Sequence, residues 1–141
     1  MGIVLEGDIT GAIVFTDVTM TGNQGGSVTY GTGIYVDTDV QIDITNLTAT
    51  SNISSSGTAP GAVFITCTTE SATGARVSIK NSAFTSNSAG DSGAVKVSRF
   101  FSVELDNITF TSNSDTFLGG GALALYATLE SNASTARINN C

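Results

Sequence analysis

The chain has 141 residues, of which 40% are hydrophobic and 12% are charged, with 16 glycines, one proline and neither histidine nor tryptophan. Its formal net charge of -7 argues against nucleic acid as a partner, because phosphate binding requires clustered Lys and Arg. No apolar run has the length of a membrane span, and the start "MGIVLEGDIT" lacks the basic region and the apolar stretch of a secretory signal.

Four segments of the chain repeat one pattern, in which apolar residues occupy the first and third positions, Asp or Asn occupies the fifth, and Asn ends the segment. They are "IVFTDVTMTGN" (13–23), "IDITNLTATSN" (42–52), "VSIKNSAFTSN" (77–87) and "VELDNITFTSN" (103–113). A second apolar segment follows each of them: "GIYV" (33–36), "AVFI" (62–65), "AVKV" (94–97) and "ALAL" (122–125). The pattern predicts two alternating strands in every repeat.

Alternation assigns the strand residues to two faces, because successive side chains point to opposite sides. The expected inward columns are Ile13/Ile42/Val77/Val103 and Phe15/Ile44/Ile79/Leu105 in the first strand, Ile34/Val63/Val95/Leu123 and Val36/Ile65/Val97/Leu125 in the second, and Met20/Ala49/Phe84/Phe110 between them. Since each column recurs once per repeat, equivalent positions should stack. A β-sandwich is the competing fold, but it does not explain one motif that recurs in order.

The repeat therefore predicts an all-β fold, a right-handed, single-stranded parallel β-helix of four to five coils without clear caps. One domain covers residues 1–141, either as a whole solenoid or as an excerpt of a longer one. The repeats begin 26–35 residues apart, and the longest connections, 66–76 and 126–137, are expected to bulge from the same side of the solenoid.

The phrase "FTSN" at 84–87 and 110–113, with "SGAV" at 92–95 and "GGAL" at 120–123, carries a resemblance to a known family. It resembles the paired FxxN and GGA(I, L or V) motifs of chlamydial polymorphic outer-membrane proteins and related parallel β-helix adhesins. Phe84, Phe110, Asn87, Asn113 and Gly120-Gly121-Ala122 match these motifs, whereas earlier coils carry Met20 or Ala49 and lack the double glycine. The resemblance implies an extracellular or surface-displayed adhesive module, with a cell-surface glycan or protein as partner.

Asparagines recur at two positions of every coil, and we expect both sets to form inward ladders that satisfy buried peptide groups. The ladders are Asn23/Asn52/Asn87/Asn113 and Asp17/Asn46/Asn81/Asn107. Four Asn-x-Ser/Thr sequons occur, at Asn46, Asn52, Asn107 and Asn132. Because three of them lie on the ladders, only Asn132 is predicted to be placed for a glycan.

Catalytic motifs are few, since a chain without histidine cannot build Ser-His-Asp or Cys-His sites, and no metal or cofactor site is predicted. The remaining candidates are Asp43, Lys80, Glu104 and Asp106, on two neighbouring outward columns of the first strand. Polysaccharide lyases and hydrolases with β-helix folds use such a face, with acids that hold calcium or transfer protons and, in lyases, a base. The competing interpretation is a solvated strand face, and we expect no enzyme.

Two further surfaces are candidates for binding. Tyr35 and Phe64 should point outward on successive coils, beside Lys96 and Ala124, as an apolar strip that docks a partner or stacks on a sugar ring. Thr-x-Thr recurs at 19–21, 48–50 and 109–111 and resembles the threonine ranks of β-solenoid ice-binding proteins, but one rank breaks at Ala83. Threonine is also a common exposed strand residue.

The two ends of the chain indicate how the solenoid assembles. "GIVLEG" (2–7) resembles a second strand and "ARINNC" (136–141) a first strand, so we expect exposed end coils. They would be covered by flanking coils of a longer chain, or by copies stacked head to tail into a filament. Cys67 and Cys141 lie more than two coils apart and should not form a disulfide.

The predicted function is a non-catalytic, extracellular or cell-surface structural or adhesive module, and the alternative is a carbohydrate-active β-helix enzyme or its fragment.

Overall fold

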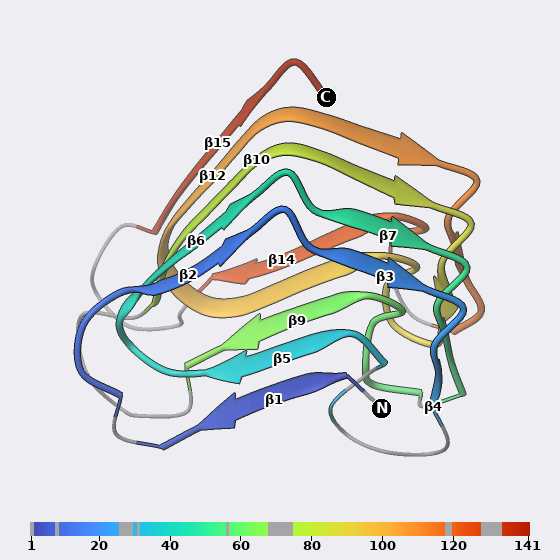
Figure 1. The fold of residues 1–141 in the computed structure, drawn as a ribbon, viewed down its shortest axis with the longest axis horizontal. Coiled ribbons are helices and arrows are strands. Elements are labelled where there is room, and N and C mark those ends of the chain that lie inside the picture. Colours follow the sequence, from blue (N-terminus) through green and yellow to red (C-terminus); the bar gives the residue numbers. More distant parts are fainter. Residues whose placement is uncertain are drawn as a thin grey trace.

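The fold is a parallel β-helix, as a computed structural model shows for residues 2–7, 9–25, 30, 32–55, 57–67, 75–117, 120–127 and 134–141. These residues form strands and turns and no helix. All strand pairs between coils are parallel, which confirms the predicted fold class. Figure 1 shows the strands of successive coils stacked side by side in chain order.

Two stacks correspond to the two strands that the sequence predicts. The first strands are β2 (Ile13–Thr16), β6 (Gln41–Thr45), β10 (Ala75–Thr85), the second half of β12 (Val95–Thr111) and β15 (Thr135–Asn139). The second strands are β1 (Ile3–Glu6), β5 (Ile34–Asp37), β9 (Val63–Thr66), the first part of β12 and β14 (Leu123–Ala127). The expected columns are in register in both stacks.

Further strands complete each coil. The segment with the Met20 column forms β3 (Thr19–Thr21), β7 (Thr48–Thr50) and the ends of β10 and β12. After the next corner come four two-residue strands, β4 (Gln24–Gly25), β8 (Ile53–Ser54), β11 (Ser88–Ala89) and β13 (Ser114–Asp115). Coils of this kind enclose one continuous apolar core, in which the central members of the inward columns are buried.

Residues in left-handed backbone turn the chain at two corners of every coil. Asp17, Asn46, Asn81 and Asn107 occupy the first corner, with φ between 50° and 57°. Gly22, Ser51, Ser86 and Ser112 occupy the second, with φ between 52° and 64°. Asp and Asn tolerate this conformation better than most residues, which explains their recurrence at the first corner, and Gly22 adopts it at the second corner without steric cost.

The Asn23/Asn52/Asn87/Asn113 column lies just after the second corner and forms a hydrogen-bonded ladder. The backbone N and Nδ2 of each of the first three Asn donate to Oδ1 of the Asn in the next coil, over 2.8–3.1 Å. The other Nδ2 hydrogen of Asn52, Asn87 and Asn113 reaches the carbonyl oxygen of Met20, Ala49 and Phe84 respectively. The predicted inward ladder is confirmed, and it links all four coils through side chains.

The second predicted ladder is wrong in its orientation. Asp17, Asn46, Asn81 and Asn107 are all exposed, because left-handed backbone at the corner turns their side chains outward. Two side-chain hydrogen bonds still follow the column, from Asn46 Nδ2 to Asp17 Oδ1 (2.8 Å) and from Asn107 Nδ2 to Asn81 Oδ1 (2.9 Å). The sequons at Asn46 and Asn107 are therefore accessible, contrary to expectation, whereas the sequon at Asn52 is buried as expected.

Candidate functional site

The outer face of the first strands brings the four predicted charged residues into two neighbouring columns. Asp43, Ser78 and Glu104 are in register in one column, and Thr45, Lys80 and Asp106 are in register in the other. Lys80 Nζ lies 3.0 Å from Glu104 Oε2 in an exposed ion pair. Asp43 instead accepts a hydrogen bond from Gln41 Nε2 over 2.8 Å.

The electrostatics of this face do not prepare Lys80 for proton abstraction. The hydrogen bond to Glu104 and the charge of Glu104 raise the pKa of Lys80 most. Desolvation opposes them, and the charges of Asp106 and Asp43 add smaller increases. A lysine base works best when its pKa is lowered toward neutrality. This arrangement instead keeps the ammonium group protonated and paired.

Tyr35 and Phe64 do point outward on adjacent second strands, in register with each other and with Lys96. They are nevertheless only 6% and 9% exposed, so the strip is not the open surface that the alternation predicts. The Tyr30 ring covers Tyr35 at a centroid distance of 4.6 Å, and Tyr35 contacts Phe64 edge-on at 5.3 Å. Burial first, and then the nearby charge of Asp37, raises the pKa of Tyr35.

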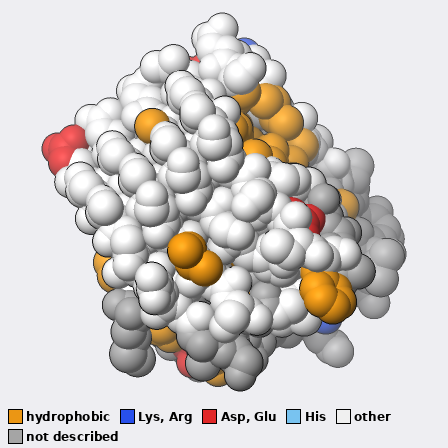
Figure 2. Space-filling model, turned by 90° about the vertical axis from the view of Figure 1, so that its right-hand side faces the viewer, with side chains coloured by type: hydrophobic (Ala, Val, Ile, Leu, Met, Phe, Trp, Pro, Cys, Tyr) orange, Lys and Arg blue, Asp and Glu red, His pale blue; other side chains and the backbone are white. Residues whose placement is uncertain are grey.

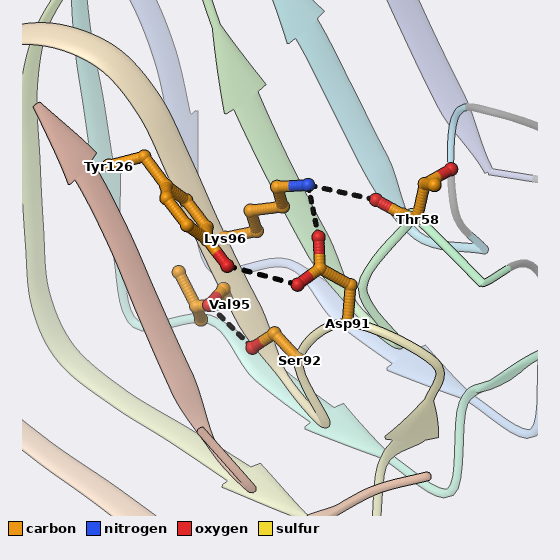
Figure 3. A network of polar contacts seen from close by, with 6 residues as sticks. All are labelled: Thr58, Asp91, Ser92, Val95, Lys96 and Tyr126. Carbon is orange, nitrogen blue, oxygen red and sulfur yellow. Dashed lines mark hydrogen bonds and ion pairs between the residues drawn. The ribbon is translucent and has the colours of Figure 1, made fainter. Parts of the chain in front are cut away.

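Lys96 lies at the other end of this aromatic row, in a largely buried ion pair that is extended by further hydrogen bonds (Figure 3). Its Nζ forms an ion pair with Asp91 Oδ2 and donates to Thr58 O over 2.9 Å. Asp91 Oδ1 accepts a hydrogen bond from Tyr126 OH over 3.1 Å. The Lys96 and Asp91 side chains are only 12% and 8% exposed, and Nζ lies 5.0 Å from the centre of the Phe64 ring.

Asp91 lies in the connection between β11 and β12. The network fixes this connection against the outer face of β9, β12 and β14. A buried ion pair is tolerable when further hydrogen bonds satisfy both partners, as Thr58 and Tyr126 do here. Lys96 also lies 5.4 Å from the ring centre of Tyr126, within the range of a cation–π contact. Partial burial and the bond to Asp91 raise the pKa of Tyr126, which keeps its hydroxyl protonated as the donor.

Sequence reasoning missed Asp91, Tyr126 and Tyr30 as members of this surface. Tyr126 could have been found, because it lies two positions beyond Ala124 and so belongs to the adjacent outward column, where it pairs with Ser98. Asp91 and Tyr30 lie in connections that do not repeat between coils, and no periodic signal marks them. The predicted glycan site at Asn132 lies outside the described residues.

The remaining candidates are a pair of threonine columns and the two cysteines. Thr21, Thr50, Thr85 and Thr111 are in register, so this column is complete, whereas the neighbouring column contains Ala83 between Thr48 and Thr109. Cys67 is buried and Cys141 is exposed, and the two are not bonded to each other. Within the described ranges, no three His, Cys, Asp or Glu side chains converge as metal ligands.

Comparison with protein-family models, with characterised proteins and with solved structures gave no match to this chain. Over the described part of the chain, the structure contains no helix with both the length and the apolar character of a membrane span.

Proposed function

We propose that this protein is a non-catalytic structural β-helix module that joins further coils at its two ends and offers its outer faces for adhesion, outside the cell or at its surface. The further coils come from flanking parts of the same chain or from another copy stacked head to tail. The adhesive role and the location rest on the resemblance of the FxxN and GGA motifs to surface-displayed β-helices.

Exposure along the inward columns is the observation that supports joining at the ends. Ile44, Ile79 and Leu105 are at most 1% exposed, whereas Ile138, the next member of their column on β15, is 50% exposed. At the opposite end Ile3 on β1 is 41% exposed, although Ile34, its partner on β5, is fully buried. The two end coils thus present apolar core to solvent, and a further coil would bury it.

The backbone of the end strands favours the same kind of partner. In the described residues β1 pairs only with β5, and β2 pairs only with β6. At the other end, β14 and β15 both pair only with β12. Each of these four strands therefore has one open edge. Open edges of this kind add a parallel strand readily. The last strand, β15, is a first strand, and the first strand of the chain, β1, is a second strand. In a head-to-tail stack, β15 of one copy and β1 of the next would therefore form one coil.

Sedimentation velocity over a range of protein concentrations tests this proposal. We expect concentration-dependent association, and we expect Ile138→Lys to abolish it by placing a charge in the exposed core cross-section. The matched control is Val14→Lys, which introduces the same charge at a 63% exposed valine on the outer face of β2. A parent that stays monomeric at high concentration, or equal loss of association in both variants, would contradict the proposal.

A carbohydrate-active enzyme is the second candidate, because Lys80 and three carboxylates do share two adjacent outward columns. Acidic polysaccharides incubated with the protein and calcium distinguish the two functions. The structural proposal expects no released product. Turnover that Lys80→Ala abolishes, while thermal stability is retained, would favour the enzyme.

A further inference from the structure

The ion pair of Lys96 and Asp91 is buried, unlike the pair of Lys80 and Glu104. The side chains of Lys80 and Glu104 are 42% and 38% exposed, whereas those of Lys96 and Asp91 are 12% and 8% exposed. Crowding of charge at the surface does not explain the difference, because the side of the molecule in Figure 2 is predominantly white, with red and blue only in isolated places. The buried pair carries a desolvation cost that a pair on the surface avoids.

Figure 3 shows one further partner for each group of the buried pair. The Lys96 ammonium contacts Asp91 Oδ2 and also donates to Thr58 O over 2.9 Å. The other carboxylate oxygen, Asp91 Oδ1, accepts from Tyr126 OH over 3.1 Å. An amide that joined Nζ to Cγ of Asp91 would have one N–H to donate and one carbonyl oxygen to accept. Thr58 O and Tyr126 OH already lie beside these two groups, so the network satisfies the amide as well as the ion pair.

Aromatic rings make the surroundings of the Lys96 amine less polar than water. Nζ lies 5.0 Å from the centre of the Phe64 ring and 5.4 Å from that of the Tyr126 ring, and Phe64 is itself only 9% exposed. Proton transfer from Nζ to Asp91 Oδ2 removes both charges at once, and apolar surroundings make this exchange less costly than it is in water. The product is a neutral amine, which is a nucleophile, beside the carbon of a carboxylic acid.

We propose that Lys96 and Asp91 join in an intramolecular isopeptide bond. After the proton transfer, the lone pair of Nζ attacks Cγ of Asp91, and the electron pair of the Cγ–Oδ1 double bond moves onto Oδ1, where Tyr126 OH stabilises the negative charge. Nζ then gives a second proton to the Oδ2 hydroxyl, the Cγ–Oδ2 bond breaks, and Oδ2 leaves as water while the Cγ–Oδ1 double bond re-forms. One ammonium and one carboxylate thus give one amide and one water molecule, without any further reactant.

The fold holds the two reacting groups in contact. Lys96 lies on β12, which pairs with β9 on one side and with β14 on the other. The connection that carries Asp91 is fixed next to this strand by a hydrogen bond from Ser92 Oγ to Val95 O over 2.8 Å. Well-oriented groups that are held in this way react as if their concentration were about 10⁵ M or more, which favours the amide over its hydrolysis. This inference does not rest on the proposed function.

Mass spectrometry of the denatured, intact chain tests the proposal, because denaturation separates an ion pair but not an amide. After incubation of the folded protein, we expect a mass below that of the sequence by one water molecule. Lys96→Arg keeps a cation beside Asp91 but has no nucleophilic amine, and it should show the full mass. The matched control is Lys80→Arg, at the exposed ion pair, which should lose water as the parent does. Tyr126→Phe keeps the ring without the hydroxyl and should slow the loss of water by roughly 100-fold.

Digestion with trypsin locates the bond. Trypsin does not cleave after an acylated lysine, so the linked chain should yield peptide 81–99 with one water missing, in place of peptides 81–96 and 97–99. A parent with the full mass of its sequence, or with normal cleavage after Lys96, would overturn the proposal even if the variants did not fold. A water deficit that persists in Lys96→Arg would also overturn it, because the loss would then come from cyclisation of an Asp or Asn side chain onto its own backbone.

Discussion

Asn87 Oδ1 accepts two hydrogen bonds from Asn52, one from its backbone N over 3.0 Å and one from its Nδ2 over 2.8 Å. Both residues are fully buried. Asn87 in turn donates to Asn113 Oδ1 and to Ala49 O, so one side chain contacts the coils on either side. Within the described residues no buried side-chain nitrogen or oxygen lacks a hydrogen-bond partner.

Asn87→Ala should therefore destabilise the protein. The substitution leaves the backbone N of Asn52 and the carbonyl of Ala49 without these partners, and one unsatisfied buried group costs about 1–3 kcal/mol. Urea denaturation measures the effect, with Asn139→Ala on the end strand β15 as the control. Equal stability of parent and Asn87→Ala would remove the ladder from the account of coil stacking.

Gly93→Ala should be more damaging than an ordinary glycine substitution. A Cβ at this position would lie 2.0 Å from Gly121 O and 2.7 Å from Ser114 N, both backbone atoms of the next coil. Forced overpacking of this kind costs roughly 1–3 kcal/mol. Gly57→Ala is the control, because a Cβ there has no neighbour within 4 Å. Thermal unfolding followed by circular dichroism should separate the variants, and similar midpoints would refute the close approach of the coils.

Arg99→Gly should stabilise the protein. Arg99 has a φ of 53° at the bulge in β12, where a side chain costs about 1–2 kcal/mol. Glycine removes this strain at an entropic cost of about 0.5–1 kcal/mol, which leaves a gain of up to about 1.5 kcal/mol. Arg137→Gly removes the same charge from the regular strand β15 and should lower stability. Chemical denaturation of both variants gives the two signs, and a loss in Arg99→Gly contradicts the assigned backbone.

Tyr35 makes stability depend on pH at the alkaline end. Its pKa in the folded state lies above the ordinary value of about 10, so folding favours the protonated phenol. This contribution is complete below about pH 10 and is lost as the pH rises through the folded-state pKa. The stability of the parent relative to Tyr35→Phe should therefore be constant from pH 7 to 9 and decrease above pH 10. A difference that stays constant to pH 11 would contradict the burial of this side chain.

The fold could be predicted from sequence because its determinants are local and repeat once per coil. Strand alternation placed Ile42, Val77 and their equivalents inside, and the final Asn of each segment marked the buried ladder. The Asp43, Lys80, Glu104 and Asp106 columns followed from the same alternation. Periodicity alone was enough for these features.

Exposure could not be predicted where it depends on parts of the chain that do not repeat. Tyr35 and Phe64 point outward as expected, but Tyr30, Lys96 and Asp91 cover the row from connections and adjacent strands. Asn46 and Asn107 were predicted inward, although at a corner the sign of φ decides the direction of the side chain and alternation does not apply. The 17-residue β12 shows the same limit, since it passes through a bulge at Arg99 without interruption.

Cysteine cross-linking between end coils tests the central proposal, the joining of coils end to end, most directly. If β15 of one copy stacks beside β2 of the next, Ile138 lies next to Phe15, because both continue one inward column. Adjacent strands place equivalent Cα atoms within the 4.4–6.8 Å that a disulfide requires. A chain with Ile138→Cys and Phe15→Cys, and with Cys67 and Cys141 replaced by alanine, should form covalent oligomers under mild oxidation. A chain with Ile138→Cys and Val14→Cys, whose second thiol points outward, should not, and monomers alone from the Ile138–Phe15 pair would contradict end-to-end stacking.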